Sequence, residues 1–323
     1  MKVLITGAAG FLGQRLAREL LARSVLKSAS GTLEPITRLV LLDVVAAPDF
    51  DDPRVQIETG DISVRSVLDR VIDADTAAIF HLAAIVSGQA EADFDLGMRI
   101  NLDASRLVLD VCRARGHRPR VVFTSSVAVY GGTLSDVVLD DTALNPQSSY
   151  GAQKAIAELL LSDYTRRGFV DGRVLRLPTI SVRPGAPNAA ASSFASGIIR
   201  EPLNGVRAIC PVAPETRIWL LSPHKAIDCL IAGLELDTAA LGERRTLNLP
   251  GLSVSVAQMV EALRDVAGDA AASLIDWQPD PRIERIVGSW PGHWDTLRAE
   301  RLGLSGDRSF ADVIRAYRDE ITP

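Results

Sequence analysis

Apolar residues recur along this chain in two alternating patterns, short continuous runs and longer stretches at helical spacing. Residues 2–5 form a short, partly β-branched apolar run that predicts a buried strand. Residues 11–23 repeat apolar side chains at the spacing of one helix face, which predicts a helix. The same alternation continues through the first half of the chain. It predicts strands at 38–43, 55–57, 77–84 (with the exit of that strand), 120–126 and 174–179, and helices at 64–72, 101–114 and 150–167.

Strands that alternate with helices imply right-handed crossovers, so we expect an α/β fold with a doubly wound parallel sheet of the Rossmann type. The pattern becomes less regular after residue 182. We therefore divide the chain into a Rossmann-type domain over 1–182 and a smaller C-terminal substrate-binding lobe over 183–323, interleaved with the end of the sheet. In the lobe we expect strands at 217–223, 246–249 and 274–277, and helices at 224–236, 255–267 and 309–320. Loops, turns or irregular segments are expected at 24–37, 85–99, 201–205 and 278–295.

Three glycines at three-residue spacing separate the first predicted strand from the first predicted helix. Gly7 permits a sharp turn, Gly10 lets the backbone approach a pyrophosphate, and Gly13 lets the helix lie against the sheet. The helix that begins at Phe11 and Leu12 then offers free N–H groups to phosphate oxygens. An ordinary strand-to-helix turn is the alternative, but the strand and helix context favours a dinucleotide-binding site.

An acidic side chain closes the second predicted strand of the sheet. Asp43 would accept hydrogen bonds from the adenosine ribose hydroxyls and repel a 2′-phosphate, so we expect NAD rather than NADP as the cofactor. Asp43 lies 30 residues after Gly13, beyond the usual spacing of about 20, and the expected loop at 24–37 accounts for the difference. A surface aspartate is the alternative interpretation.

Composition and charge narrow the class of protein. The chain has 323 residues, 47% of them hydrophobic, and a net charge of −5, which argues against nucleic acid or an anionic membrane as the main partner. It shows neither a secretory leader nor an apolar run of membrane-spanning length. Cys112, Cys210 and Cys229 are scattered and odd in number, which favours reduced thiols, a cytoplasmic location and no metal site.

Two residues with complementary chemistry lie four positions apart in a predicted helix. Tyr150 and Lys154 therefore share one helix face. A nearby ammonium and a nicotinamide charge would lower the pKa of the phenol, so Tyr150 could act as a base while hydride leaves the same carbon. Ser126, at the end of a strand, could hold the substrate oxygen, with Ser125 as the fallback. His81 also ends a strand, and we interpret it as a packed structural residue rather than a base.

The segments TGAAGFLG, TSSVAVYG and YGAQK occur in an order that resembles the extended short-chain dehydrogenase/reductase superfamily. That resemblance implies a Rossmann fold, NAD, and catalysis by Ser126, Tyr150 and Lys154, the last of which would also hold the nicotinamide ribose. It also implies a homodimer through helices 101–114 and 151–167. The further cofactor contacts that we expect are Phe11, Leu12, Asp61, Ile62, Leu82, Ala83, Ala84, Asn101 and Pro178.

Longer segments, including IVSGQAEADFDLGMRINLD and RLPTISVRPGAPNAAASSFASGIIREPLNG, resemble one branch of that superfamily, the bacterial D-erythronate dehydrogenases. The resemblance implies NAD-dependent oxidation of the C2 hydroxyl of this four-carbon sugar acid to 2-keto-D-erythronate. An acid substrate needs a good guanidinium, for which Arg183 and Arg217 are the candidates. The expected substrate contacts are Ser87, Ser126, Tyr150, Thr179, Arg183, Asn188 and Arg217.

Other functions use the same cofactor-binding motifs. A nucleotide-sugar epimerase would need a lobe that grips a diphosphate, and the lobe has few paired cations. An L-threonine-type dehydrogenase remains an alternative because the first half specifies the cofactor and not the substrate. A cofactor-sensing regulator would keep the glycines but usually lose the Tyr150–Lys154 pair, so we expect an enzyme.

Overall fold

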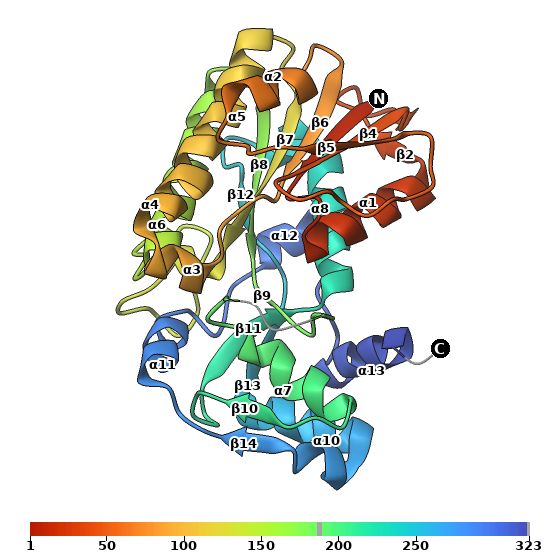
Figure 1. Cartoon of the computed structure of the whole chain (residues 1–323). Coiled ribbons are helices and arrows are strands. Elements are labelled where there is room, and N and C mark those ends of the chain that lie inside the picture. Colours follow the sequence, from red (N-terminus) through yellow and green to blue (C-terminus); the bar gives the residue numbers. More distant parts are fainter. Residues whose placement is uncertain (186–188, 322–323) are drawn as a thin grey trace.

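The computed structural model describes residues 1–185 and 189–321 and shows a parallel sheet above a smaller lobe (Figure 1). All the neighbouring strands of the seven-stranded sheet run parallel, which confirms the expected α/β, Rossmann-type architecture. Its strands lie in the order β12 (Thr246–Asn248), β8 (Asp171–Leu177), β7 (Arg120–Ser126), β6 (Thr76–His81), β1 (Lys2–Thr6), β4 (Arg38–Asp43) and β5 (Val55–Thr59).

Helices cover both faces of this sheet, and each layer has its own apolar core. On one face α1 (Phe11–Arg23) and α8 (Pro223–Glu235) bury leucines and isoleucines against β1, β4 and β7. On the other face α2 (Arg65–Val71), α5 (Ala104–Arg115) and α6 (Ser149–Arg166) pack on the opposite side chains of the same strands. Strands buried on both faces explain the continuous apolar runs in the sequence.

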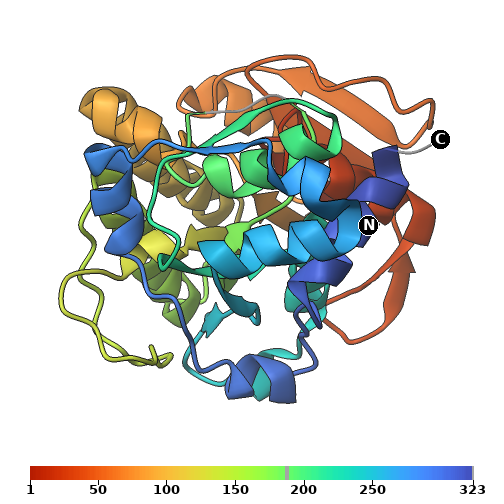
Figure 2. The same cartoon turned by 90° about the horizontal axis from the view of Figure 1, so that it is seen from below.

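The lobe is built around an apolar core of its own, formed by residues between Val182 and Tyr317. Seen from below (Figure 2), α7 and α10 cross the lobe, and α13 lies beside α1, to which Glu320 and Arg15 link it by an ion pair. The elements of the lobe are β9 (Thr179–Ile180), α7 (Phe194–Leu203), β10 (Ala208–Cys210), β11 (Arg217–Leu221), β13 (Leu252–Ser255), α10 (Val256–Ala272), β14 (Ile275–Trp277), α11 (Pro281–Gly288) and α13 (Phe310–Ile321).

The chain passes between the two parts more than once. It leaves the sheet at Pro178, because β8 belongs to the sheet and β9 pairs with β11 in the lobe. It returns to the sheet through α8 and β12, and β12 pairs with β8. The short helices α9 (Thr238–Leu241) and α12 (Leu297–Arg301) flank this returning segment.

Several segments that we expected to be irregular have regular structure. The expected loop at 24–37 contains a hairpin of β2 (Val25–Lys27) and β3 (Leu33–Pro35). The expected loop at 85–99 contains α3 (Ser87–Ala92), α4 (Phe94–Gly97) and the start of a π-helix, η1 (Met98–Asp103), and the short 3-10 helix η2 (Val127–Val129) follows β7. The segment 278–295 contains α11, and α7 includes Glu201–Leu203 of the turn expected at 201–205.

Candidate functional site

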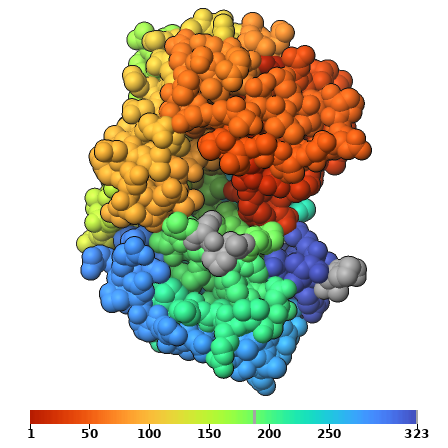
Figure 3. Space-filling view, in the orientation of Figure 1, coloured from red at the N-terminus to blue at the C-terminus, as the bar shows by residue number. Residues whose placement is uncertain are grey.

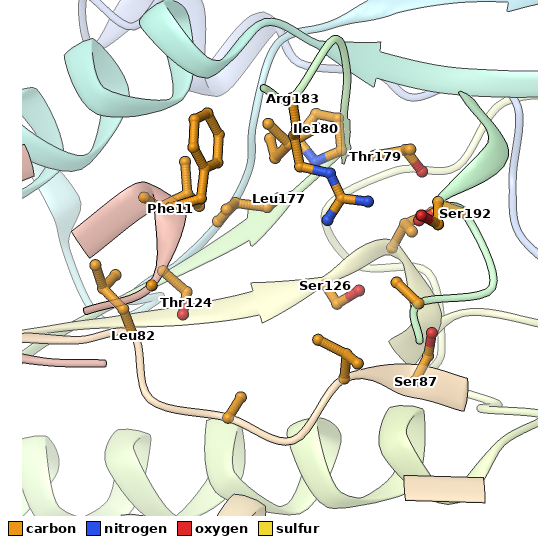
Figure 4. A pocket seen from close by; sticks show the side chains of 18 of the residues that line it. Phe11, Leu82, Ser87, Thr124, Ser126, Leu177, Thr179, Ile180, Arg183 and Ser192 are labelled. Carbon is orange, nitrogen blue, oxygen red and sulfur yellow. The ribbon is translucent and has the colours of Figure 1, made fainter. Parts of the chain in front are cut away.

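A cavity of about 400 Å³ lies where the carboxyl ends of the sheet strands face the lobe (Figures 3 and 4). The space-filling view shows the surface hollowed between the two parts. This is the edge at which open α/β sheets bind ligands. Of the residues that we predicted, the cavity is lined by Gly7, Gly10, Phe11, Leu12, Gly13, Leu82, Ala84, Ser87, Ser125, Ser126, Tyr150, Lys154, Pro178, Thr179 and Arg183.

The glycine loop at one end of the cavity leaves no room for side chains at two of its positions. Gly7 has φ +72°, and a Cβ there would lie 2.7 Å from the backbone nitrogen of Ala83. A Cβ on Gly13 would lie 2.3 Å from the carbonyl oxygen of Gly7. Gly10 is the N-cap of α1 and makes no side-chain cap, so the first-turn amides stay available to an anion. The loop therefore fits a dinucleotide pyrophosphate.

The predicted cofactor residues that do not line the cavity are Asp43, Asp61, Ile62, Ala83 and Asn101. Asp43 ends β4, and its Oδ2 accepts a hydrogen bond from the backbone of Ala9, 3.0 Å away, so its carboxylate stands next to the glycine loop. Asp61 is held by Ser63 and by Arg99, with 2.6 Å between Nη1 and Oδ2. Ile62 is buried next to Asp61, and Ala83 packs against Gly7.

Asn101 is buried in η1, behind the cavity, and its side chain links two other segments by hydrogen bonds. Its Oδ1 accepts from the backbone nitrogen of Ile85 at 2.8 Å, and its Nδ2 donates to the carbonyl of Ile85 and to Gln153 Oε1. Asn101 therefore ties the exit of β6 to helix α6. The structure does not place its side chain in the cavity lining.

His81 has the packed environment that we expected. Its Nδ1 lies 2.7 Å from Thr6 Oγ1 and its Nε2 lies 3.0 Å from Ser105 Oγ. Burial, together with the charge of Lys154, lowers the pKa of His81 to about 3. A neutral imidazole bonded at both nitrogens is not available to the cavity as a base.

Tyr150 and Lys154 occupy one face of α6 at the wall of the cavity. The Lys154 Nζ lies 5.7 Å from the centre of the Tyr150 ring and donates to the carbonyl oxygen of Thr124 at 2.9 Å. Burial lowers the pKa of Lys154 to about 7, against the opposing charge of Glu158. Burial raises the pKa of Tyr150 to about 12, while a hydrogen bond with Ser126 lowers it.

The fold adds an effect on the pKa of Tyr150 that the sequence-based expectation did not include. The expectation considered the charges of Lys154 and the nicotinamide, and the fold adds the loss of hydration, which disfavours both a phenolate and an ammonium. The same burial moves the first proton loss of the Tyr150–Lys154 pair close to neutral pH, since the pKa of Lys154 is about 7. A pair with this property can exchange a proton with a substrate hydroxyl.

The two serines at the end of β7 point in different directions. Ser126 lines the cavity, where Figure 4 shows its hydroxyl. Ser125 also lines the cavity, but it is buried and its hydroxyl donates to the carboxylate of Glu158. Of the two candidates, therefore, Ser126 has its hydroxyl at the reaction site.

The predicted substrate residues are only partly gathered in the cavity. Ser87, Thr179 and Arg183 line it, and Figure 4 shows the Arg183 guanidinium pointing into it. Arg217 does not: its side chain is exposed and donates to the carbonyl and hydroxyl of Ser253. Asn188 lies outside the described residues.

Several lining residues were not among our predicted contacts, and Arg200 and Trp290 are two of them. Arg200, on α7, is buried, lines the cavity, and donates to the carbonyl oxygen of Arg183 at 2.9 Å. Burial and the charge of Arg200 lower the pKa of Arg183, so the cavity holds two guanidinium groups close enough to repel. Trp290, between α11 and α12, also lines the cavity. In the sequence, the one signal that could have identified Trp290 as a site residue is that glycine and proline residues flank it.

The comparison with protein families agrees with this site. The model of the NAD dependent epimerase/dehydratase family matches residues 3–214, which include the glycine loop, Ser126, Tyr150 and Lys154. The chain belongs to this family. It is therefore an enzyme of an NAD-dependent family.

Relatives within the epimerase/dehydratase family extend over the whole chain. A D-erythronate dehydrogenase of Cupriavidus necator is 66% identical over 99% of this chain and 98% of its own length. One from Haemophilus influenzae is 48% identical over 98% of both chains. A solved structure titled as a nucleoside-diphosphate-sugar epimerase from Agrobacterium tumefaciens is 44% identical, has a TM-score of 0.92, and aligns over 99% of this chain and 94% of its own.

Two further observations concern the described residues as a whole. Within 1–185 and 189–321, no three His, Cys, Asp or Glu side chains are placed together to hold a metal ion. In that same part of the chain, none of the helices has both the length and the apolar character needed to cross a bilayer.

Proposed function

We propose that this enzyme oxidises the C2 hydroxyl of D-erythronate to 2-keto-D-erythronate, with NAD as the hydride acceptor. The observation that carries the proposal is the 66% identity to a D-erythronate dehydrogenase over nearly the full length of both chains. The geometry of the cavity supports it, because a proton-accepting pair, Tyr150 and Lys154, and the guanidinium of Arg183 line one cavity of about 400 Å³. A four-carbon acid needs both a base for its hydroxyl and a cation for its carboxylate.

In the proposed reaction, the hydroxyl of Ser126 positions the substrate C2 hydroxyl next to Tyr150. The reacting form is the Tyr150–Lys154 pair that has lost one proton, with that proton missing from the phenol and Lys154 still charged. In this form the phenolate of Tyr150 takes the proton of the substrate hydroxyl, and the ammonium of Lys154 offsets the negative charge of the phenolate. Arg183 binds the carboxylate, supported by Arg200, so that C2 is oriented toward the glycine-loop end of the cavity. NAD, when bound, supplies the acceptor for the hydride that leaves C2.

The residues of this chain also support NAD over NADP. The carboxylate of Asp43 stands beside the glycine loop through its bond to Ala9. There it would accept from ribose hydroxyls and repel a 2′-phosphate. We further propose that residues 1–182 hold the cofactor, with Asp61, Ile62, Ala83 and Asn101 in supporting places, and that the lobe over 183–323 selects the substrate.

A homodimer and a cytoplasmic location complete the proposal. Ile156 and Leu159 on the outer face of α6 are 42% and 67% exposed, which supports a contact between helices α5 and α6 of two copies. The three cysteines are buried and form no disulfide with one another, as suits a reducing compartment. Light scattering of the wild type and of Leu159→Glu would test the dimer; a monomeric wild type would contradict it.

The test of function is NADH formation with a panel of acids: D-erythronate, L-erythronate, D-threonate and L-threonate, with L-threonine and a UDP-hexose as controls. We expect turnover with D-erythronate and NAD. Turnover with L-threonine alone would move the assignment to amino-acid oxidation.

A nucleoside-diphosphate-sugar epimerase is the second candidate, because a solved relative at 44% identity carries that title. Three results together would favour the epimerase: no NADH formation with any of the acids, NAD that stays bound through purification, and interconversion of the UDP-hexose.

A further inference from the structure

A buried polar cluster lies directly behind the cavity. Glu158 accepts from Arg176 through two atoms, with 2.7 Å from Nη2 to Oε2 and 3.0 Å from Nε to Oε1, and it also accepts from the hydroxyl of Ser125. Arg176 donates in turn to the hydroxyl of Tyr130, which donates to Asn248 Oδ1 at 2.8 Å. All five side chains are at most 5% exposed. The cluster is therefore held together by these hydrogen bonds and largely shielded from bulk water.

This cluster joins the elements that carry the reacting groups. Ser125 immediately precedes Ser126 on β7, and Glu158 follows Lys154 by one helical turn on α6. Arg176 lies on β8, just before the cavity residues Pro178 and Thr179. Glu158 is the member that touches both neighbouring strands at once. A shift of its carboxylate would change the position of the end of β7 relative to α6.

Glu158 also acts electrostatically on the site. Its carboxylate raises the pKa of Lys154, in opposition to burial. The other titratable groups next to Lys154 are Tyr150, on the same helix, and His81 on β6, which is neutral because its pKa is about 3. The pKa shift of Lys154 thus has two opposing causes, burial and the charge of Glu158.

The remaining charged side chains on the elements packed against α6 lie elsewhere. At the opposite, amino ends of β7 and β8, Arg120 and Arg173 pair with Asp171. The helices α3, α4, η1 and α5 carry theirs at positions that are exposed or partly exposed: Glu91, Asp95, Arg99, Asp103, Arg106, Asp110, Arg113 and Arg115.

We propose that Glu158 is a positioning residue for the oxidation, which locks the end of β7 against α6 and keeps a negative charge next to the Tyr150–Lys154 pair. The proposal rests on the proposed function in one respect, that this pair removes the substrate proton. Activity then depends on the pair having lost one proton, and the carboxylate of Glu158 sets the pH at which this happens. Removing a nearby negative charge makes that proton easier to lose.

The experiment is the pH profile of kcat for D-erythronate oxidation in Glu158→Gln at saturating NAD. We expect the acid limb to move to lower pH by about one unit, because one interacting charge shifts a neighbouring pKa by about that amount, with kcat reduced at every pH. Ser125→Ala is the matched variant: it removes a bond to the carboxylate but keeps the charge, so kcat falls and the limb stays in place. Glu158→Asp restores the charge and should return the limb to its wild-type position.

Glu158→Gln leaves Arg176 buried without its counter-charge, which can prevent folding. The double variant Glu158→Gln/Arg176→Gln removes both charges and serves in its place. Removing the positive charge of Arg176 opposes part of the effect of removing Glu158, so we expect an acid shift in the same direction but smaller. The positioning role would be refuted if the wild type is active and the acid limb of the pH profile lies at the wild-type pH in both variants. A wild type without activity on D-erythronate would instead refute the proposed function.

Discussion

Replacing Arg183 by glutamine tests how the enzyme recognises an acid substrate. The guanidinium points into the cavity, and its pKa is lowered by burial and by the neighbouring Arg200. Arg200 forms an ion pair with Glu201, and a substrate carboxylate would offset the positive charge of Arg183. Glutamine keeps part of the hydrogen bonding and removes the charge.

The expected loss follows from the place of Arg183 in the cavity. Truncating one partner of a buried, charged hydrogen bond costs about 2–4 kcal/mol. At about 1.4 kcal/mol for each factor of ten, this predicts a fall in kcat/KM of roughly 30-fold to 1000-fold. Arg200 stays in the cavity and should keep the effect from exceeding this range. We expect most of the loss in KM, since the carboxylate is bound in the ground state as well as in the transition state.

The assay is NADH formation against D-erythronate concentration, with NAD affinity measured separately by fluorescence titration. Arg217→Gln is the matched control, because Arg217 is an exposed guanidinium of the same lobe that bonds to Ser253 outside the cavity. We expect kcat/KM within about twofold of the wild type for this control, as for surface substitutions in general. Equal effects of the two substitutions, or a change in NAD affinity alone for Arg183→Gln, would refute the assignment.

The other predictions concern the reacting groups and the cofactor. Tyr150→Phe should abolish turnover and leave NAD binding intact; turnover at the wild-type rate would exclude Tyr150 as the base. Asp43→Ala should weaken NAD binding and narrow the preference for NAD over NADP, so an unchanged ratio of the two affinities would contradict the ribose contact. In wild type, kcat should rise with pH through about 7, because the Tyr150–Lys154 pair loses its first proton there; a limb near 10, the ordinary value for tyrosine, would contradict this.

The parts of the fold that were predictable from the sequence are those with strong local signals. The helix at 11–23 and the strands at 38–43 and 120–126 have the predicted bounds. Each of these strands contains a run of buried apolar residues, at 39–42 and at 121–123. The glycine spacing was informative for a similar reason, since close backbone contacts leave no room for a Cβ at two of the positions.

The segments that we predicted wrongly depend on distant contacts. Helix α3 has the sequence SGQAEA, which offers no apolar face, and it forms where Ser87 and Gly88 meet the backbone at Ala189 and Ala191. The hairpin β2–β3 consists of three-residue strands with an exposed Leu33. Such segments lack a periodic pattern, so their structure is set by tertiary packing.

The site residues likewise differ in whether a local sequence signal or the tertiary fold determines their place. The motif spacing was enough to predict that Ser126, Tyr150 and Lys154 share a site, because they lie on elements whose ends meet at one edge of the sheet. The choice between Arg183 and Arg217 was not predictable, since both begin or follow short strands of the lobe and only the fold turns one inward. The pKa of Tyr150 was also out of reach, because it depends on burial by segments far away in the sequence.

The arrangement separates the chemistry of the reaction from the choice of substrate. The proton-accepting pair is held by the sheet and α6, whereas the segment that carries Arg183 is held by α7. Ser196 accepts from the Arg183 backbone nitrogen at 3.1 Å, and Arg200 donates to the Arg183 carbonyl oxygen. A change in α7 can therefore move the substrate-binding cation without moving Tyr150 or Lys154. We infer that substitutions at Ser196 or Arg200 would alter which acid is oxidised, while the pH limb set by the Tyr150–Lys154 pair stays in place.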